Sequence, residues 1–301
     1  MKMRIMLAVI AMLGISSLAF GDEIDNRFQK ARKYLHDNKL MVTTSVEQAF
    51  AQDAILVIGE GVPKKGVTGG QKRLTAVTAA KVIAQRRLAE MLEGVAIVSE
   101  TTVKDSELVS DAIKTAVTGF IKGTQVVMQD WNEREETALV ILKVGMNGPK
   151  SFAALMYEKI LTEPKIKQEL DKPAYTPPAD VPPPAAAPQS FDGLIIDATD
   201  YSFRPALINR IFNPKGEVLY DPAKISQKVL VEQGCGEYTN SVDKARAALR
   251  KRGVNNPLVV KASGTVSPSD LQVADATAVQ IFSANQNSGF MADARVAFVL
   301  K

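Results

Sequence analysis

The stretch "KRLTAVTAAKVIAQRRLAEMLEG", residues Lys72 to Gly94, decides the fold of the first half of the chain. Apolar residues recur in it every three or four positions, which is the period of an amphipathic helix. Gly94 follows as a natural C-terminal stop. The pattern predicts a long helix with one buried face, made of Val77, Ala80, Ala84, Leu88 and Met91.

Strand patterns lie on both sides of this helix. We expect strands in "AILVIGEG" (54–61), "VAIVSETTV" (95–103), "TQVVMQDW" (124–131) and "TALVILKVGM" (137–146), with the last two forming a hairpin. A second helix is expected from Asp105 to Lys122, capped by Asp105 or Ser106 and ended by Gly123. Two helices packed on one face of a small, mainly antiparallel sheet would bury both apolar stripes.

Two further helices are predicted in the first half. Ile24, Phe28, Ala31 and Leu35 recur at helical spacing in an N-terminal helical segment, residues 22–53. Residues 151–161 have the pattern of another helix. We therefore assign residues 54–170 to a first α+β domain.

A proline-rich segment, "DKPAYTPPADVPPPAAAPQ", divides the chain. Proline lacks an amide hydrogen and fixes its own backbone, so this segment is unsuited to a sheet or a helix interior. We interpret residues 171–190 as an extended linker, with a docking tract for an aromatic groove as the alternative. Residues 191–301 then form a second α+β domain, and the chain is an α+β protein of two small modules.

The second module opens with "GLIIDATDY", residues 193–201, an apolar strand that ends in Asp197 and Asp200. A hairpin is expected in residues 208–220, a capped helix in 241–253, and strands in 257–262 and 293–300. Residues 268–287 are expected to end in a short helix.

The first 21 residues have the pattern of a cleaved secretory signal. Lys2 and Arg4 precede an apolar core, residues 5–18, and small residues end at Gly21. The alternative is a membrane anchor, although the apolar run is short for a span. No cysteine lies near the cleavage site, so we expect no lipid anchor and no transmembrane segment after cleavage. The expected location is the periplasm, with a secreted or cell-surface protein as the alternative.

Composition excludes several kinds of site. Cys235 is the only cysteine and His36 the only histidine, so an intramolecular disulfide, a Cys/His zinc site and a Ser-His-Asp triad are ruled out. Cys235 lies between glycines and is predicted to be a small buried or turn residue; a reactive thiol is the alternative. The net charge of +4 is small and its cations are dispersed, so we expect no nucleic-acid partner. We expect no metal and no cofactor.

The first module resembles a known family in "ILVIGEGVP", "RLTAVTAAKVIAQRRLAEMLEGVAIVSETTVKD", "VTGFIKGTQVV" and "ALVILKVGM". Over residues 54–146 these elements are similar to the N-terminal domain of the flagellar protein FlgT and to the LPP-twenty family of bacterial lipoproteins. The resemblance implies a non-enzymatic envelope component, although this chain lacks the lipoprotein cysteine. The second module looks like a C-terminal domain of uncharacterised exported bacterial proteins, which implies no activity.

The loop "GEGVPKKGVTGGQKR", residues 59–73, is the first candidate for chemistry. Gly61 and Gly66 have the spacing of a phosphate loop, but Val67 stands where its lysine is needed. The dinucleotide pattern fails as well, because residue 64 is not glycine. An ordinary loop is the simpler interpretation. The other is a weak anion site at the helix start, formed by Lys64, Lys65, Lys72 and Arg73.

Asp197 and Asp200 are the second candidate. Two carboxylates at a strand end could bind a divalent metal, but their spacing is not the Asp-x-Asp of aspartate-nucleophile phosphatases. They could instead form an Asx turn, cap the amide of Tyr201, or make ion pairs with Arg204 or Arg210. A lone Trp131 at a strand end marks either a binding surface or the edge of the core.

These patterns favour a non-catalytic exported envelope protein over an enzyme. It would be a structural or interaction component of the periplasm or cell surface, in a flagellar or outer-membrane-associated assembly. Its partners would be envelope or surface proteins, or a second copy of itself. The alternative is a periplasmic ligand-binding protein or hydrolase that uses the Asp197/Asp200 region with Arg204.

Overall fold

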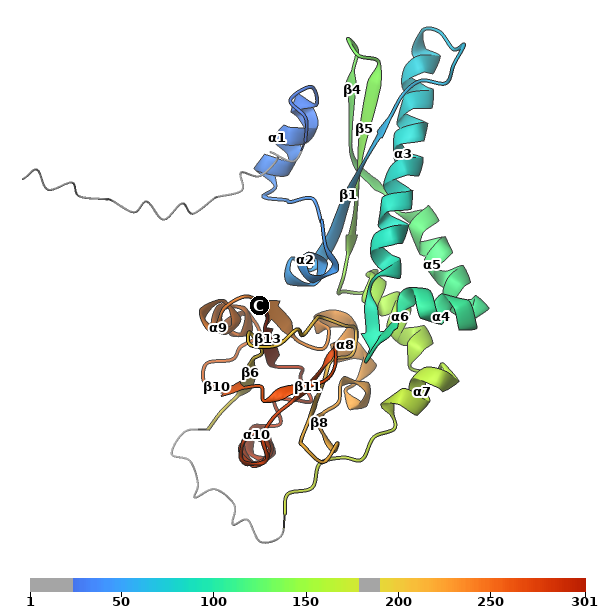
Figure 1. The fold of residues 1–301 in the computed structure, drawn as a ribbon. Coiled ribbons are helices and arrows are strands. Elements are labelled where there is room, and N and C mark those ends of the chain that lie inside the picture. The colour runs from blue at the N-terminus through green and yellow to red at the C-terminus, as the bar shows by residue number, and fades with distance from the viewer. Residues whose placement is uncertain (1–23, 179–189) are drawn as a thin grey trace, which may run out of the picture.

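The computed structural model describes residues 24–178 and 190–301 (Figure 1). The predicted signal and the centre of the predicted proline-rich linker therefore lie outside the described residues. The fold is α+β, as the sequence predicts, and the helices and strands form two modules.

The first module is built on a three-stranded antiparallel sheet of order β1-β5-β4. The strands are β1 (Ala54–Gly61), β4 (Val126–Asn132) and β5 (Thr137–Gly145), and β4 and β5 form the predicted hairpin. The long helix α3 (Gly70–Glu93) lies along one face of this sheet (Figure 1).

Two glycines bring α3 unusually close to the sheet. A Cβ atom built on Gly59 would lie 2.1 Å from the carbonyl oxygen of Ala80, and one on Gly61 would lie 2.4 Å from that of Ala76. Only glycine fits at such distances, so the paired glycines of β1 and the alanines of α3 belong to one contact.

The buried face of α3 differs in part from the predicted one. Ala80, Ala84 and Leu88 are buried as expected, but the ends of the stripe are Ala76 and Leu92. Val77 and Met91 are only partly buried. The buried residues of α3 recur every four positions, so the line that they form winds slowly around the helix. Such a line can follow a strand that is itself twisted. The prediction was therefore wrong by one residue at each end.

The segment after α3 is more broken than the sequence suggested. Instead of one strand over 95–103, β2 (Ala96–Val98) and β3 (Thr101–Thr102) pair across a turn at Ser99, whose φ is +55°. Instead of one helix over 105–122, α4 (Val103–Val109) and α5 (Asp111–Gly123) are separated at Ser110.

Local capping explains the break. The hydroxyl of Ser110 accepts a hydrogen bond from the amide of Ile113 and starts α5. Thr102, not Asp105 or Ser106, is the N-cap of α4, and it exchanges hydrogen bonds with Asp105 in a capping box. Capping serines and threonines compete with helix continuation, which periodicity alone does not show.

The other face of the first sheet is covered by α1 (Gln29–Asp37). The four residues of the predicted stripe are all buried, but only Ala31 and Leu35 lie in the helix, because Ile24 and Phe28 precede it. All four pack with Leu56, Leu139 and Ile141 of the sheet. A short helix, α2 (Val46–Ala51), lies within the predicted helical segment 22–53, although its bounds were not predicted. It follows Ser45, whose side chain accepts a hydrogen bond from the amide of Gln48.

The second module contains a parallel sheet of order β10-β6-β13-β9. Its strands are β6 (Gly193–Asp197), β9 (Glu237–Thr239), β10 (Pro257–Lys261) and β13 (Val296–Val299). Helix α9 (Val242–Lys251) packs on one face, and its predicted cap is confirmed, because Ser241 accepts a hydrogen bond from Lys244. A mixed sheet, β11-β12-β7-β8, adds β7 (Arg210–Phe212), β8 (Val218–Tyr220), β11 (Gly264–Ser267) and β12 (Asp270–Gln272). The predicted hairpin is β7–β8, and the remaining helices are α8 (Gln227–Gln233) and α10 (Asp275–Ser288), with a short 3-10 turn η1 (Pro222–Lys224).

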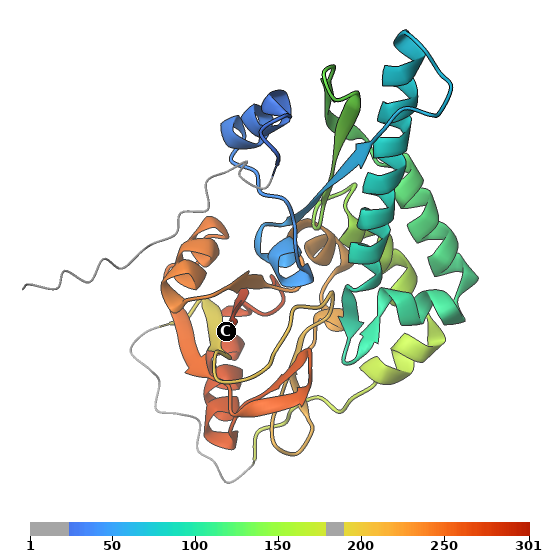
Figure 2. The same ribbon diagram turned by 45° about the horizontal axis from the view of Figure 1, so that its top comes forward.

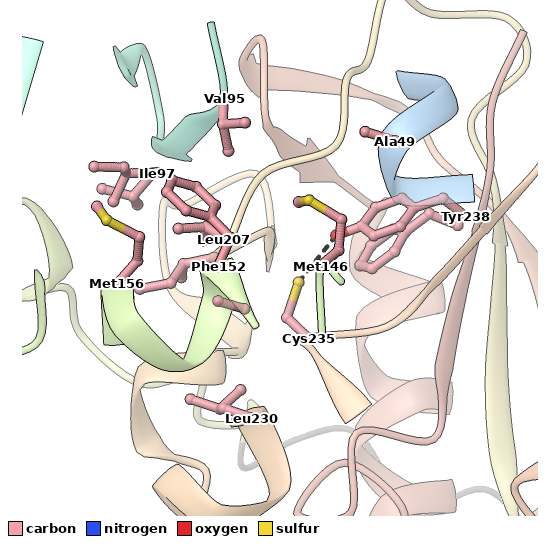
Figure 3. Packing of buried hydrophobic residues seen from close by; sticks show 14 of the residues in the cluster. Ala49, Val95, Ile97, Met146, Phe152, Met156, Leu207, Leu230, Cys235 and Tyr238 are labelled. Atoms are coloured by element: carbon pink, nitrogen blue, oxygen red, sulfur yellow. Dashed lines mark hydrogen bonds between the residues drawn. The ribbon is translucent and has the colours of Figure 1, made fainter. Parts of the chain in front are cut away.

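The two modules share a single hydrophobic core. The predicted helix α6 (Phe152–Ile160) and the unpredicted helix α7 (Pro164–Leu170) lead from the first module toward the second. Figure 3 shows Phe152 and Met156 of α6 packed among Ile97, Leu207 and Leu230. Backbone amides of Leu207 and Ile208 also donate to the carbonyls of Ala96 and Ile97, at 2.9 and 2.8 Å. Within the described residues, none of the helices has the length and apolar character needed to cross a membrane.

Candidate functional site

A polar cleft of about 360 Å³ lies where the two modules meet. One wall comes from the first module: helices α2 and α6, the residue before β1 and a residue just after β5. The other wall comes from the second module: the loop between α8 and β9 and the end of α9. The residues that line it include Phe50, Asp53, Asn147 and Tyr157 from the first module and Cys235, Glu237, Tyr238 and Arg252 from the second. We call this space the junction cleft.

The floor of the cleft is a hydrogen-bonded cluster around Cys235. The hydroxyl of Tyr238 lies 2.5 Å from Asn209 Oδ1 and 3.0 Å from Cys235 Sγ (Figure 3). Cys235 is only 2% exposed, so the prediction of a buried residue is confirmed. Burial raises the pKa of the Cys235 thiol and, more strongly, that of the Tyr238 hydroxyl. The thiol therefore stays protonated near neutral pH and is a poor nucleophile.

The walls carry charged groups that are held in place. Asp53 Oδ1 accepts hydrogen bonds from the backbone amide and the side-chain amide of Asn147, at 3.0 and 2.8 Å. Asp53 has a φ of +54°, a left-handed conformation that aspartate adopts more readily than most non-glycine residues. Desolvation raises the pKa of its carboxyl.

On the opposite wall, each of the three guanidinium nitrogens of Arg252 donates one hydrogen bond. Its Nε donates to Glu237 Oε1 at 2.7 Å, and its two terminal nitrogens donate to the carbonyls of Ala294 and Gln233. The cleft thus combines the second carboxylate oxygen of Asp53 with a neutralised Glu237–Arg252 pair. Such a site can recognise a small polar ligand by charge and hydrogen bonding.

The thiol of the cleft has no histidine beside it. The only histidine, His36, lies on the exposed side of α1, so the thiol has no imidazole base. The part of the chain that the structure describes holds no group of three or more His, Cys, Asp or Glu residues arranged for a metal ion.

Arg210 is not a partner of Asp197 or Asp200. Its guanidinium forms a bidentate ion pair with Asp270, at 3.0 and 2.8 Å, and both residues are almost completely buried. It also donates to Ser99 Oγ and to the carbonyl of Glu169 in the first module. We call this set the interlock, because it joins the two modules through one buried charge pair.

Asp197 and Asp200 make different direct contacts. Asp197 Oδ1 accepts hydrogen bonds from the amide and the hydroxyl of Thr199, at 3.1 and 2.6 Å, which is an Asx turn of the kind that the sequence allows. These bonds lower the pKa of Asp197. Asp200 is exposed and lies 3.7 Å from Lys261 Nζ.

Tyr201 and Arg204 do not contact the two aspartates through the predicted bonds. The amide of Tyr201 donates to the carbonyl of Ala198 rather than to an aspartate. The amide of Arg204 donates to the carbonyl of Pro268, and its Nε is buried with no partner in the described residues. The structure therefore places neither Arg204 nor Arg210 in an ion pair with Asp197 or Asp200.

The lysine-rich loop lies at the far end of the first module. Lys64, Lys65 and Arg73 are exposed, whereas Lys72 Nζ pairs with Glu136 at 2.5 Å. The loop amide of Lys64 donates to Thr75 Oγ1 of α3. Trp131, near this end of the sheet, is partly buried against the core and covers its edge.

Comparison with known proteins bears on the second module. A family model described as Treponema pallidum Tp0624, second domain, matches residues 193–301. The match begins where β6 begins and covers less than half of the chain. No curated protein matches the chain. Nothing in this match concerns residues 54–146, so their resemblance to FlgT and the LPP-twenty family stays a prediction.

Apart from Cys235 and Arg210, the residues that build the junction cleft and the interlock carry no signal in the sequence. Asp53, Asn147 and Glu237 come from three segments that are distant in sequence, and no spacing links them. The one local signal was "EQGCGEY", where two glycines flank Cys235. A Cβ on Gly234 would lie 2.8 Å from Asn147 Oδ1, so this glycine permits the close approach of the two modules.

Proposed function

We propose that this chain is a non-catalytic exported envelope protein, a structural or interaction component of the periplasm or cell surface. The observation that supports this most is the chemistry of the junction cleft. Its thiol is buried and stays protonated, and its arginine is paired with Glu237 and two carbonyls. A hydrolase would need an activated nucleophile or water at such a place.

The docking of the modules also supports the proposal. The interlock and the shared core hold residues of both modules in direct contact, so the two modules form one body. A body of this kind can present fixed surfaces to envelope or surface proteins, or to a second copy. The resemblance of residues 54–146 to FlgT and LPP-twenty domains suggests a flagellar or outer-membrane-associated assembly.

The test is crosslinking of the mature protein in envelope extracts, followed by pull-down and identification of the captured proteins. We expect envelope proteins to be crosslinked by the folded protein and not by a urea-unfolded sample. Hydrolysis of an ester, phosphate, glycan or peptide substrate by the purified protein would contradict the proposal, provided that Asp53→Asn abolishes it.

A second candidate function is the binding of a small zwitterionic ligand in the junction cleft. The observation that favours it is that charged groups of both modules, Asp53 and the Glu237–Arg252 pair, line the same cleft. A ligand site built on Asp197, Asp200 and Arg204 is not supported, because Asp197 is held in a turn and Asp200 is exposed.

A thermal-shift screen with the free amino acids tests this second candidate. A ligand present at about 100 times its Kd would raise the free energy of unfolding by about 2.7 kcal/mol. Asp53→Asn should remove the shift, and Asp200→Asn, on the exposed surface, should not. No shift at millimolar ligand would exclude amino acids as the ligand.

A further inference from the structure

The end of the first module farthest from the second carries an unusual loop. Figures 1 and 2 show the loop between β1 and α3, together with the β4–β5 turn, at this projecting end. Residues 62–74 contain four cations, Lys64, Lys65, Lys72 and Arg73, and no acidic residue. We call residues 62–74 the tip.

Two of the three glutamates in the β4–β5 turn are paired, and the third, Glu133, is exposed next to Arg134, which carries the opposite charge. Glu136 of the β4–β5 turn binds Lys72, and Glu135 binds Arg27 at 2.9 Å. Among the described residues, Lys64, Lys65 and Arg73 have no carboxylate within ion-pair distance, and all three are exposed. The tip therefore keeps three uncompensated positive charges.

Exposed apolar side chains accompany these cations. Val62 is 65% exposed and Leu74 is 67% exposed, and they stand at the two ends of the tip. Elsewhere in the first module most large apolar side chains lie inside one of its cores, and the other exposed ones that the structure describes are Met41, Val82 and Leu108. Cations beside exposed aliphatic residues are the combination that binds at the interface of an anionic membrane.

We propose that the tip docks on the surface of an anionic phospholipid bilayer. Lys64, Lys65 and Arg73 would contact headgroup phosphates, while Val62 and Leu74 would enter the boundary of the acyl chains. A site for a soluble anion would need cations that converge, whereas these are spread along an exposed loop. The contact goes beyond the proposed envelope function, which names proteins as partners.

Vesicle co-sedimentation of the mature protein tests the contact. The probe is vesicles of phosphatidylcholine with or without phosphatidylglycerol. Each basic residue near an anionic surface strengthens binding about fivefold, so replacing three should weaken it about a hundredfold. We expect binding only to the phosphatidylglycerol vesicles, and its loss in the triple variant Lys64→Gln, Lys65→Gln, Arg73→Gln.

A matched control separates the tip from general charge. The control variant removes three positive charges from exposed positions outside the tip, by Lys150→Gln, Lys165→Gln and Lys167→Gln. It should bind the vesicles nearly as well as the wild type. Val62→Ser with Leu74→Ser should weaken vesicle binding without changing net charge. Circular dichroism of each variant confirms that it is folded.

Three results would overturn the proposal. The first is that the protein does not bind phosphatidylglycerol vesicles. The second is that the control variant loses as much vesicle binding as the tip variant. The third is that soluble polyphosphate displaces the vesicles while Val62→Ser with Leu74→Ser does not weaken binding. The last result would assign the tip to a soluble polyanion. None of these results affects capture of envelope proteins by crosslinking, so failure here is distinguishable from failure of the proposed function.

Discussion

At the scale of single residues, two aspartates illustrate how environment sets charge. Asp197 accepts two hydrogen bonds from Thr199, which favour its charged form, whereas Asp53 is partly withdrawn from water, which disfavours it. The sequence could suggest the turn at Asp197, because an aspartate in a loop readily accepts a hydrogen bond from the amide two residues on. It could not reveal the desolvation of Asp53, which needs Asn147 and the second module.

The opposite pKa shifts predict opposite effects of pH. The lowered pKa of Asp197 adds stability above its ordinary pKa of 3.8, and this stability is lost as pH falls. The raised pKa of Asp53 means that its carboxyl holds a proton in the folded state at a pH where the unfolded chain has lost it. As pH rises past the ordinary pKa, the charged Asp53 therefore lowers the free energy of unfolding. Urea unfolding from pH 3 to pH 7 measures both.

We expect Asp197→Asn to lose stability relative to the wild type as pH rises, and Asp53→Asn to gain it. Both substitutions keep the Oδ1 acceptor, so hydrogen bonding changes little. Asp200→Asn is the control, because Asp200 is exposed. The same pH profile in all three variants would refute the assignment.

A second residue-scale prediction concerns the floor of the junction cleft. Tyr238→Phe removes the hydroxyl that contacts Asn209 Oδ1 and the carbonyl of Ala206. The loss leaves buried acceptors with fewer partners and should cost about 1–3 kcal/mol of unfolding free energy. Urea denaturation measures it against Tyr34→Phe on α1, which should cost little. Equal costs would argue against a structural role for the cluster.

At the scale of elements, the β1–α3 contact determines the first module. Gly59→Ala should force β1 and α3 apart, since its Cβ would lie 2.1 Å from Ala80 O and 2.4 Å from Ala84 N. Overpacking of this kind costs roughly 1–3 kcal/mol, or more against backbone atoms. Thermal unfolding should show a markedly lower midpoint.

Gly119→Ala in α5 is the matched control for Gly59→Ala. A Cβ at Gly119 meets nothing within 4 Å, and alanine is favoured over glycine inside a helix by about 0.5–1 kcal/mol. The control should therefore unfold at an equal or higher temperature. Tolerance of alanine at position 59 would mean that β1 and α3 are farther apart than described.

Element identity was largely predictable, and element ends were not. Strand β1 follows from its run of apolar residues, and the spacing before Leu35 identifies the residues that α1 and the segment before it bury. The break at Ser110 and the turn at Ser99 depend on capping and on a left-handed residue, which leave no periodic signal. The shifted face of α3 depends on glycines in another element.

At the scale of the whole molecule, the modules are joined by more than the proline-rich segment. The interlock places a fully buried ion pair of β7 and β12 against Ser99 and Glu169 of the first module. Breaking one partner of such a pair leaves a buried charge and costs about 3–5 kcal/mol. The sequence could not show this, because Arg210 and Asp270 are distant in sequence and no motif links them.

This arrangement predicts that the two modules unfold together. The only tryptophan, Trp131, lies in the first module, so its fluorescence reports on that module alone. Asp270→Asn, in the second module, should lower the urea midpoint seen by Trp131 as much as the midpoint seen by far-ultraviolet circular dichroism. Asp200→Asn should move neither signal. If Asp270→Asn left the Trp131 midpoint unchanged while the dichroism midpoint fell, the modules would be independent, and the shared core could not be the reason that they dock.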